Sequence, residues 1–129
     1  MNEKMTELED RVALGDKEAM MKLADALKWG LYGEVDLARA AALYRECAKS
    51  VVRKVSSAGF YNLGLFYYFG YLEEEPNERL AFDCFMKSAL RFPNRAALGK
   101  LADMYRYGQY VEQNEKVALA LYGSAARAS

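Results

Sequence analysis

The sequence contains no histidine and only two cysteines, Cys47 and Cys84. Without an imidazole there is no Ser/His/Asp or Cys/His catalytic arrangement and no zinc site with a histidine ligand. Two thiols are also too few for a zinc site made of four cysteines. These absences exclude the commonest catalytic and zinc-binding arrangements, and we expect neither a metal nor a cofactor.

The chain also lacks an excess of charge of either sign. Its 18 Lys and Arg residues balance its 18 Asp and Glu residues, and its isoelectric point is about 6.3. Binding to nucleic acid or to an anionic membrane surface usually requires a concentration of basic residues. The composition therefore favours neither nucleic acid nor a membrane as a partner.

No apolar run approaches the length of a membrane span, and residues 1–7 lack the apolar stretch of a signal peptide. We therefore expect a cytoplasmic protein in which Cys47 and Cys84 are buried, reduced thiols. The 129 residues, of which 53% are hydrophobic, are enough for a single domain with a continuous core.

The chain does contain one motif written three times, in residues 22–30, 62–70 and 100–108. Each copy has a leucine, then a small residue, then a large residue, and it closes with a glycine. The closing glycines are 40 and 38 residues apart. Self-similarity at this period indicates an array of helical repeats. We expect all three glycines to have positive φ at the ends of their helices.

Each repeat is predicted to be a pair of helices. The second helix of each pair has one alanine four residues before and one four residues after a central aromatic residue, which is Tyr44, Phe85 or Tyr122. These rings are therefore expected to be largely buried. Residues suited to capping the helices are Asp16, Asp36, Ser56, Asn77, Asn94 and Asn114. The expected helices span residues 7–14, 17–29, 37–50, 57–69, 78–91, 95–107 and 115–127.

The segment before the first repeat is predicted to be a short helix that covers one end of the core. Thr6 and Glu9 have the spacing of a capping box, which places the start of this helix at residue 7. The extra residues 49–55 are expected to prolong the helix that precedes them. The predicted division is a capping helix in 1–14 and repeats in 15–50, 56–91 and 93–129.

The repeat pattern resembles the Sel1-like repeat family, and the resemblance spans nearly the whole chain. It rests on the Leu–small–large–Gly pattern of the first helices and on the Ala–aromatic–Ala pattern of the second helices. The chain departs from the family at Leu27, where a tyrosine is usual. The resemblance implies an all-α, right-handed superhelical solenoid of tetratricopeptide-like helix pairs. It also implies a non-catalytic adaptor or scaffold in which the first helices line a concave groove.

Carrying over that geometry gives a set of groove positions on the first helices. The middle repeat is apolar at these positions, and basic residues flank it, so the expected partner is a peptide with an apolar or aromatic anchor and acidic groups. The alternative is that the apolar positions only pack between repeats. The predicted groove residues are Lys22, Asp25, Lys28, Trp29, Tyr61, Leu65, Tyr68, Phe69, Lys100, Asp103, Arg106 and Tyr107.

The sequence is also compatible with two other functions. One is a self-associating structural protein, a homodimer that pairs through the carboxyl-terminal repeat, because no polar closing helix follows that repeat. The other is a hydrolase that uses Asp25 and Asp103 as paired carboxylates. The sequence favours the binding module, since it has no phosphate-binding loop, metal-ligand spacing or activated nucleophile.

Overall fold

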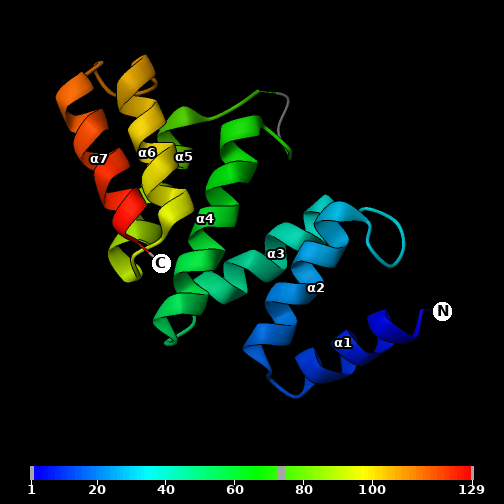
Figure 1. The fold of residues 1–129 in the computed structure, drawn as a ribbon. Coiled ribbons are helices and arrows are strands. Elements are labelled where there is room, and N and C mark those ends of the chain that lie inside the picture. Colours follow the sequence, from blue (N-terminus) through cyan, green and yellow to red (C-terminus); the bar gives the residue numbers. More distant parts are fainter. Residues whose placement is uncertain (1, 73–74, 129) are drawn as a thin grey trace.

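The computed structural model describes residues 2–72 and 75–128, and all regular structure within these ranges is helical. Helices α2 and α3 form the first repeat, α4 and α5 the second, and α6 and α7 the third. Figure 1 shows the antiparallel pairs following one another, with α1 and α7 at opposite ends of the array. The helices are α1 (Glu3–Ala13), α2 (Lys17–Trp29), α3 (Leu37–Ala48), α4 (Arg53–Phe69), α5 (Glu78–Arg91), α6 (Arg95–Tyr107) and α7 (Glu115–Arg127).

Five of the six predicted caps are confirmed. In each, the side-chain oxygen accepts a hydrogen bond from the backbone N–H three residues further on, which satisfies one of the free donors of the first turn. This is why the predicted starts of α2, α3, α5, α6 and α7 are correct. The confirmed caps are Asp16, Asp36, Asn77, Asn94 and Asn114.

The predicted start of α1 is wrong. The helix begins at Glu3, and Thr6 lies inside it. Asn2 is the cap, because its side-chain oxygen accepts hydrogen bonds from the backbone N–H groups of both Lys4 and Met5. An asparagine that satisfies two free donors therefore starts the helix one turn before the capping box.

The junction between the first two repeats also differs from the prediction. Helix α3 ends at Ala48, residues 49–52 form the connection, and residues 53–55 extend the beginning of α4. Val52 occupies the N-cap of α4 without a side-chain hydrogen bond. Ser56 is therefore not a cap; its buried hydroxyl donates to the backbone carbonyl of Ala48 at 2.7 Å and so joins α4 to the end of α3.

The three closing glycines have the predicted conformation. The φ angles of Gly30, Gly70 and Gly108 are 64°, 68° and 66°, in the left-handed region. Each glycine donates its N–H to a carbonyl in the last turn of its helix. A residue with a Cβ would be strained there, so these positions stop α2, α4 and α6 at the same point of each repeat.

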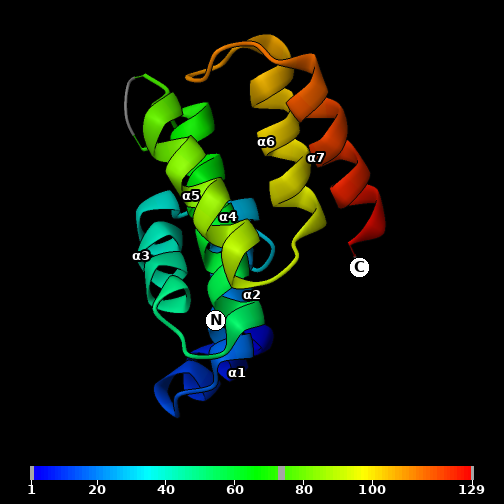
Figure 2. The same cartoon turned by 90° about the vertical axis from the view of Figure 1, so that its left-hand side faces the viewer.

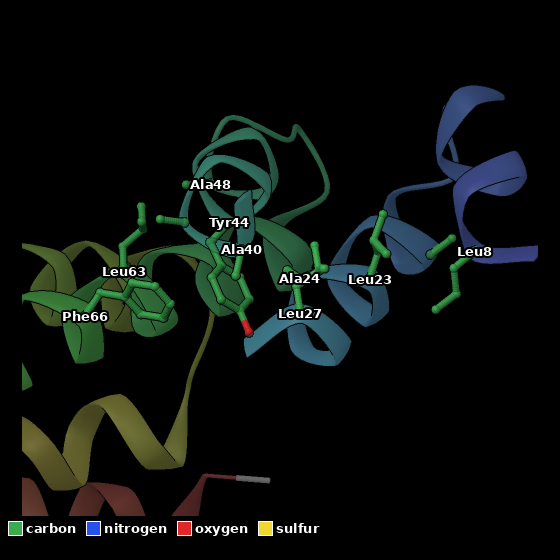
Figure 3. Packing of buried hydrophobic residues seen from close by; sticks show 11 residues of the cluster. Leu8, Leu23, Ala24, Leu27, Ala40, Tyr44, Ala48, Leu63 and Phe66 are labelled. Carbon is green, nitrogen blue, oxygen red and sulfur yellow. The ribbon is translucent and has the colours of Figure 1, made fainter. Parts of the chain in front are cut away.

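The core consists of small and large apolar side chains that form two clusters. One cluster of buried residues extends from Leu8 in α1 to Phe66 in α4, and a second joins α5 to α6. Figure 3 shows Tyr44 between Phe66 on one side and Ala24 and Leu27 on the other. Burying these side chains removes apolar surface from water, which is the main stabilising contribution in an array of this kind.

How far the rings of Tyr44, Phe85 and Tyr122 are buried depends on whether another repeat follows. Tyr44 and Phe85 are fully buried, as predicted. Tyr122 is only half-buried, so the prediction for this ring is wrong. The reason is that helices of the next repeat cover the first two rings, whereas no helix of the described residues lies beyond α7 to cover the third.

Helix α4 makes unusually close backbone approaches to both of its neighbours. A Cβ atom added to Gly59 would lie 2.5 Å from the backbone nitrogen of Ala48 in α3. One added to Gly64 would lie 2.5 Å from the ring of Phe85 in α5. The two glycines therefore let α4 lie closer to α3 and to the Phe85 ring than any larger residue would allow.

A buried group of polar side chains joins α4, α5 and the beginning of α6. The hydroxyl of Ser57 donates to the carbonyl of Ser88 at 2.8 Å, and the hydroxyl of Ser88 donates to the carbonyl of Ser57 at 2.7 Å. The side-chain amide of Asn94 donates to both hydroxyl oxygens, while its oxygen caps α6. The three side chains satisfy one another, as buried polar groups must.

The cysteines lie on α3 and α5 and are not joined to each other. Cys47 is buried, whereas Cys84 is only partly buried, which corrects the expectation that both are fully covered. Burial raises the pKa of each thiol to about 11, so both are protonated near neutral pH. Within the described residues, no helix combines the length and the apolar character that crossing a membrane requires.

Candidate partner-binding groove

The last residue of each first helix is an exposed aromatic residue. Trp29, Phe69 and Tyr107 stand directly before the closing glycines, and their exposed fractions are 65%, 48% and 64%. We call these three residues the rim aromatics. Because the glycines end the three helices in the same way, the rim aromatics occupy one equivalent position in every repeat. Large aromatic side chains exposed at a repeated position are a common feature of protein interaction surfaces.

Basic side chains lie over the faces of these rings. The Lys100 ammonium is 5.2 Å from the ring centre of Phe69 and 4.9 Å from that of Tyr68. The Arg106 guanidinium is 5.3 Å from the ring centre of Tyr107. At these distances the cations are attracted to the ring faces, which orders both groups. The surface of α4 and α6 therefore presents positive charge directly beside aromatic side chains.

Lys28 differs from the other basic residues of the predicted groove. Only 8% of its surface is exposed, and its ammonium lies 4.9 Å from the Trp29 ring centre, with the rings of Phe66 and Tyr71 within 6 Å. Burial lowers the pKa of Lys28, against a smaller opposing effect of Asp25. Lys28 thus fastens the first repeat to the aromatic rings of the second, and the accessible positive charge belongs to Lys22, Lys100 and Arg106.

The two predicted groove aspartates are bound inside their own repeats. The Tyr44 hydroxyl donates to Asp25, and the Tyr122 hydroxyl donates to Asp103, each at 2.5 Å. Burial, and then the hydrogen bond to Asp25, raises the pKa of the Tyr44 phenol. Each carboxylate thus has a tyrosine partner within its own repeat. Within residues 2–72 and 75–128, no group of acidic and cysteine side chains is arranged to hold a metal ion.

The second repeat replaces both members of this pair at once. Leu65 stands at the position of the aspartates, and Phe85 stands at the position of the tyrosines. The rings of Tyr61 and Tyr68 lie 5.9 and 6.2 Å from that of Phe85. Tyr61, Leu65 and Tyr68 are half-buried, so they contribute to the core and also keep part of their surface exposed. Of the three repeats, the second is therefore the most apolar at the predicted groove positions.

Two residues that belong to this surface were not predicted. Tyr71 stacks on Phe69 at 5.5 Å, and Gln109 accepts a hydrogen bond of 2.9 Å from the Tyr68 hydroxyl. Both stand directly after a closing glycine, at the position that Leu31 has in the first repeat. Extending the repeat alignment by one residue past the glycine would have revealed them.

A cleft of about 330 Å³ lies at the amino end of the groove, between α1 and α2. Its lining combines the predicted groove residues Lys22 and Asp25 with charged residues of α1 and with the loop residues Leu31 and Tyr32. Arg11 in this cleft forms an ion pair of 2.7 Å with Asp16, which joins α1 to the start of α2.

Tyr44→Phe is expected to lower the free energy of unfolding by about 1 kcal/mol, because it removes the donor to Asp25 in a buried site. Chemical denaturation measures this loss. Tyr122→Phe is the matched control and should cost less, since its ring is half-buried. The double variant Asp25→Leu, Tyr44→Phe copies the Leu65 and Phe85 pair and should recover part of the loss. An equal cost for both single variants would contradict this account.

Comparisons with known proteins agree with this architecture. The family model described as Sel1 repeat matches residues 17–50, 61–91 and 95–129. A crystal structure of a Sel1 repeat protein from Oxalobacter formigenes aligns with a TM-score of 0.82 and 24% sequence identity. The alignment covers 95% of this chain and 48% of that one, so the chain spans about half the length of the solved protein. Among curated proteins, no sequence matches.

Proposed function

Because the chain belongs to the Sel1 repeat family, whose members act in protein–protein interactions, we propose that it is a non-catalytic adaptor that binds a protein segment along α2, α4 and α6. The residues that carry this binding are the predicted groove positions other than Lys28, together with Tyr71. In this proposal Lys28 has an indirect part, since it holds the rim rather than contacting the partner. The free thiols of Cys47 and Cys84 support a reducing compartment such as the cytoplasm.

The single observation that carries the proposal is the row of rim aromatics. Trp29, Phe69 and Tyr107 remain largely exposed to water. They therefore do not contribute the stabilisation that burying an aromatic side chain provides. Their repetition in three helices argues that the exposure serves a shared purpose. Aromatic residues of this kind contribute the largest energies in many interfaces.

The charges beside the rim specify the chemistry of the partner. Lys22, Lys100 and Arg106 take part in none of the ion pairs within the described residues. A segment with an apolar or aromatic anchor would contact the exposed rings, and neighbouring acidic groups would meet these three cations. Such exposed charge pairs are screened by salt, so part of the affinity should depend on ionic strength.

Selection from a random peptide library displayed on phage would test the proposal. We expect the selected peptides to combine aromatic residues with Asp or Glu. Phe69→Ala or Tyr107→Ala should weaken their binding about tenfold, because truncating a central aromatic contact has effects of this order. Fluorescence anisotropy with labelled peptides measures the affinity, and added salt should reduce it further.

The matched control is Leu90→Ala, which removes an exposed leucine from α5, a second helix. This variant should bind the selected peptides as the wild type does. Peptides that bind equally to the Phe69→Ala and Tyr107→Ala variants, or that lose affinity in the Leu90→Ala variant instead, would place the binding surface elsewhere and overturn the proposal.

A further inference from the structure

An open pocket of about 270 Å³ is lined by four residues of α7 and by Arg106 of α6, the neighbour of the rim residue Tyr107. We call it the end-face pocket. Figure 2 shows that α7 forms the outer edge of the array at this end. Its lining consists of Arg106, Glu115, Ala118, Leu119 and Tyr122. The first two repeats have residues at the positions that line this pocket. The side chains that pack against those residues therefore show what kind of side chain the end-face pocket could bind.

In the first repeat the equivalent pocket is filled by Phe66 of α4. The ring of Phe66 meets that of Tyr44 edge to face at 5.8 Å, and the Lys28 ammonium is 5.8 Å from its centre. Phe66 is only 3% exposed, and Ala41 on the wall of the pocket is completely covered. An aromatic ring under a cation is therefore the natural occupant of this arrangement.

In the second repeat the equivalent pocket is filled from α6. Met104 is fully buried and packs with Phe85 and Ala81. Phe82, at the position of Ala41, meets the ring of Tyr105 at 6.0 Å. Two repeats thus receive an apolar side chain from the same position of the helix that follows them.

In the third repeat this position is open. Leu119 stands where the first repeat has Ala41 and the second has Phe82, and 69% of its surface is exposed. Ala126, which corresponds to the buried Ala48, is also exposed. The face that receives a helix twice inside the array is therefore free on α7, within the part of the chain that the structure describes.

The end-face pocket resembles the first pocket more than the second. Arg106 takes the place of the Lys28 cation, and Tyr122 is held by Asp103 as Tyr44 is held by Asp25. The second pocket has no cation at this position and accepts a methionine. The third pocket is therefore suited to an aromatic side chain that lies against Arg106 and Tyr122.

The two internal helices also show the pattern that an occupant needs. In α4 the small residue Gly59 lies against α3, and Phe66 follows seven residues later. In α6 the buried residues Ala97 and Met104 have the same spacing. We propose that the end-face pocket binds an amphipathic helix of a second protein, which has a small residue and, seven residues further on, an aromatic residue.

A second copy of this chain does not supply such a helix. Phe66 and Met104 are 3% and 0% exposed, so α4 and α6 are already engaged. In α2 the equivalent position is occupied by Ala26, which is small and buried, and α1 covers the neighbouring surface around Ala19. The described helices therefore offer no free aromatic residue at this position, so a second copy is not the proposed occupant.

A fluorescent peptide of residues 53–71 tests this proposal, because it carries the helix that fills the first pocket. Anisotropy should show saturable binding to the purified chain. The Phe66→Ala peptide should bind at least about tenfold more weakly, and the Leu119→Asp protein should lose a similar factor. Leu90→Asp, a charge placed on another exposed leucine, should leave the affinity unchanged, and so should the rim variant Phe69→Ala.

Circular dichroism would confirm that Leu119→Asp keeps its helices, as expected for an exposed position. The proposal is overturned if the wild type does not bind the peptide, or if Leu119→Asp binds it equally well, since the peptide would then enter the interior. It is also overturned if sedimentation equilibrium shows a dimer of the chain that Leu119→Asp dissociates, because the pocket would then serve self-association. Retained binding in the rim variant separates this result from the groove proposal.

Discussion

Phe85→Ala is expected to lower the free energy of unfolding by about 3–5 kcal/mol, the usual cost of deleting a buried aromatic ring. Phe85 is completely buried in the middle repeat, where the rings of Tyr61 and Tyr68 lie about 6 Å from it. Gly64 brings the backbone of α4 against one edge of the same ring. Neighbours on several sides hold the surrounding helices in place, so the cavity will collapse only partly. Urea denaturation followed by circular dichroism measures the loss.

Phe69→Ala is the matched control, because it removes the same ring from an exposed position of the same repeat. We expect it to change stability much less, since little buried surface is lost. If both variants unfold at the same urea concentration, Phe85 is not the centre of the second core cluster and the alignment of the repeats is incorrect.

Gly59→Ala should destabilise the protein by about 2 kcal/mol, although alanine ordinarily favours a helix interior over glycine by roughly 0.5–1 kcal/mol. The added Cβ would lie 2.5 Å from the nitrogen of Ala48 and 2.7 Å from the carbonyl oxygen of Tyr44. Both are backbone atoms of α3, so they cannot rotate away as a side chain would. The steric cost of separating two packed helices therefore exceeds the gain in helix propensity.

Gly99→Ala provides the opposite test within the same chain. Gly99 lies inside α6, and an added Cβ would meet nothing within 4 Å. Only the propensity effect remains, and we expect stabilisation of roughly 0.5–1 kcal/mol. Thermal or chemical unfolding of the two variants should thus shift in opposite directions. A shift of Gly59→Ala toward higher stability would show that α3 and α4 lie further apart than described.

The sequence predicts most of the helix ends because local chemistry decides them. Asp36 and Asn114 illustrate the N-terminal ends, where one side-chain oxygen satisfies a free N–H whatever lies nearby. Gly30 illustrates the C-terminal ends, where the left-handed conformation excludes most other residues. These rules act over a few residues, so a single sequence is enough to apply them.

The misplaced starts of α1 and α4 show where local rules compete. Thr6 and Ser56 both have the residue type of a cap, but each lies inside a helix. Asn2 displaces Thr6 because it reaches two free donors. Ser56 bonds instead to the carbonyl of Ala48 across the interface with α3, a contact that depends on tertiary packing.

The candidate groove was predicted by residue position but not by the state of each side chain. Lys28 and Arg106 are equivalent in the repeats, yet Lys28 is buried and Arg106 is exposed. The difference comes from Phe66 and Tyr71, which belong to the following repeat and cover only Lys28. Periodicity treats the repeats as equal, whereas burial depends on the neighbour that each one has.

Asn94 has a consequence for the cooperativity of unfolding. If the third repeat unfolded alone, the side chain of Asn94 would move away from α4 and α5. The hydroxyls of Ser57 and Ser88 would then each lose a hydrogen-bond donor. That penalty adds to the lost packing between the repeats, so fraying from this end is opposed. Amide protons at the start of α6 should therefore exchange with solvent at nearly the same free energy as those of α5. The second and third repeats then behave as one cooperative unit in hydrogen exchange.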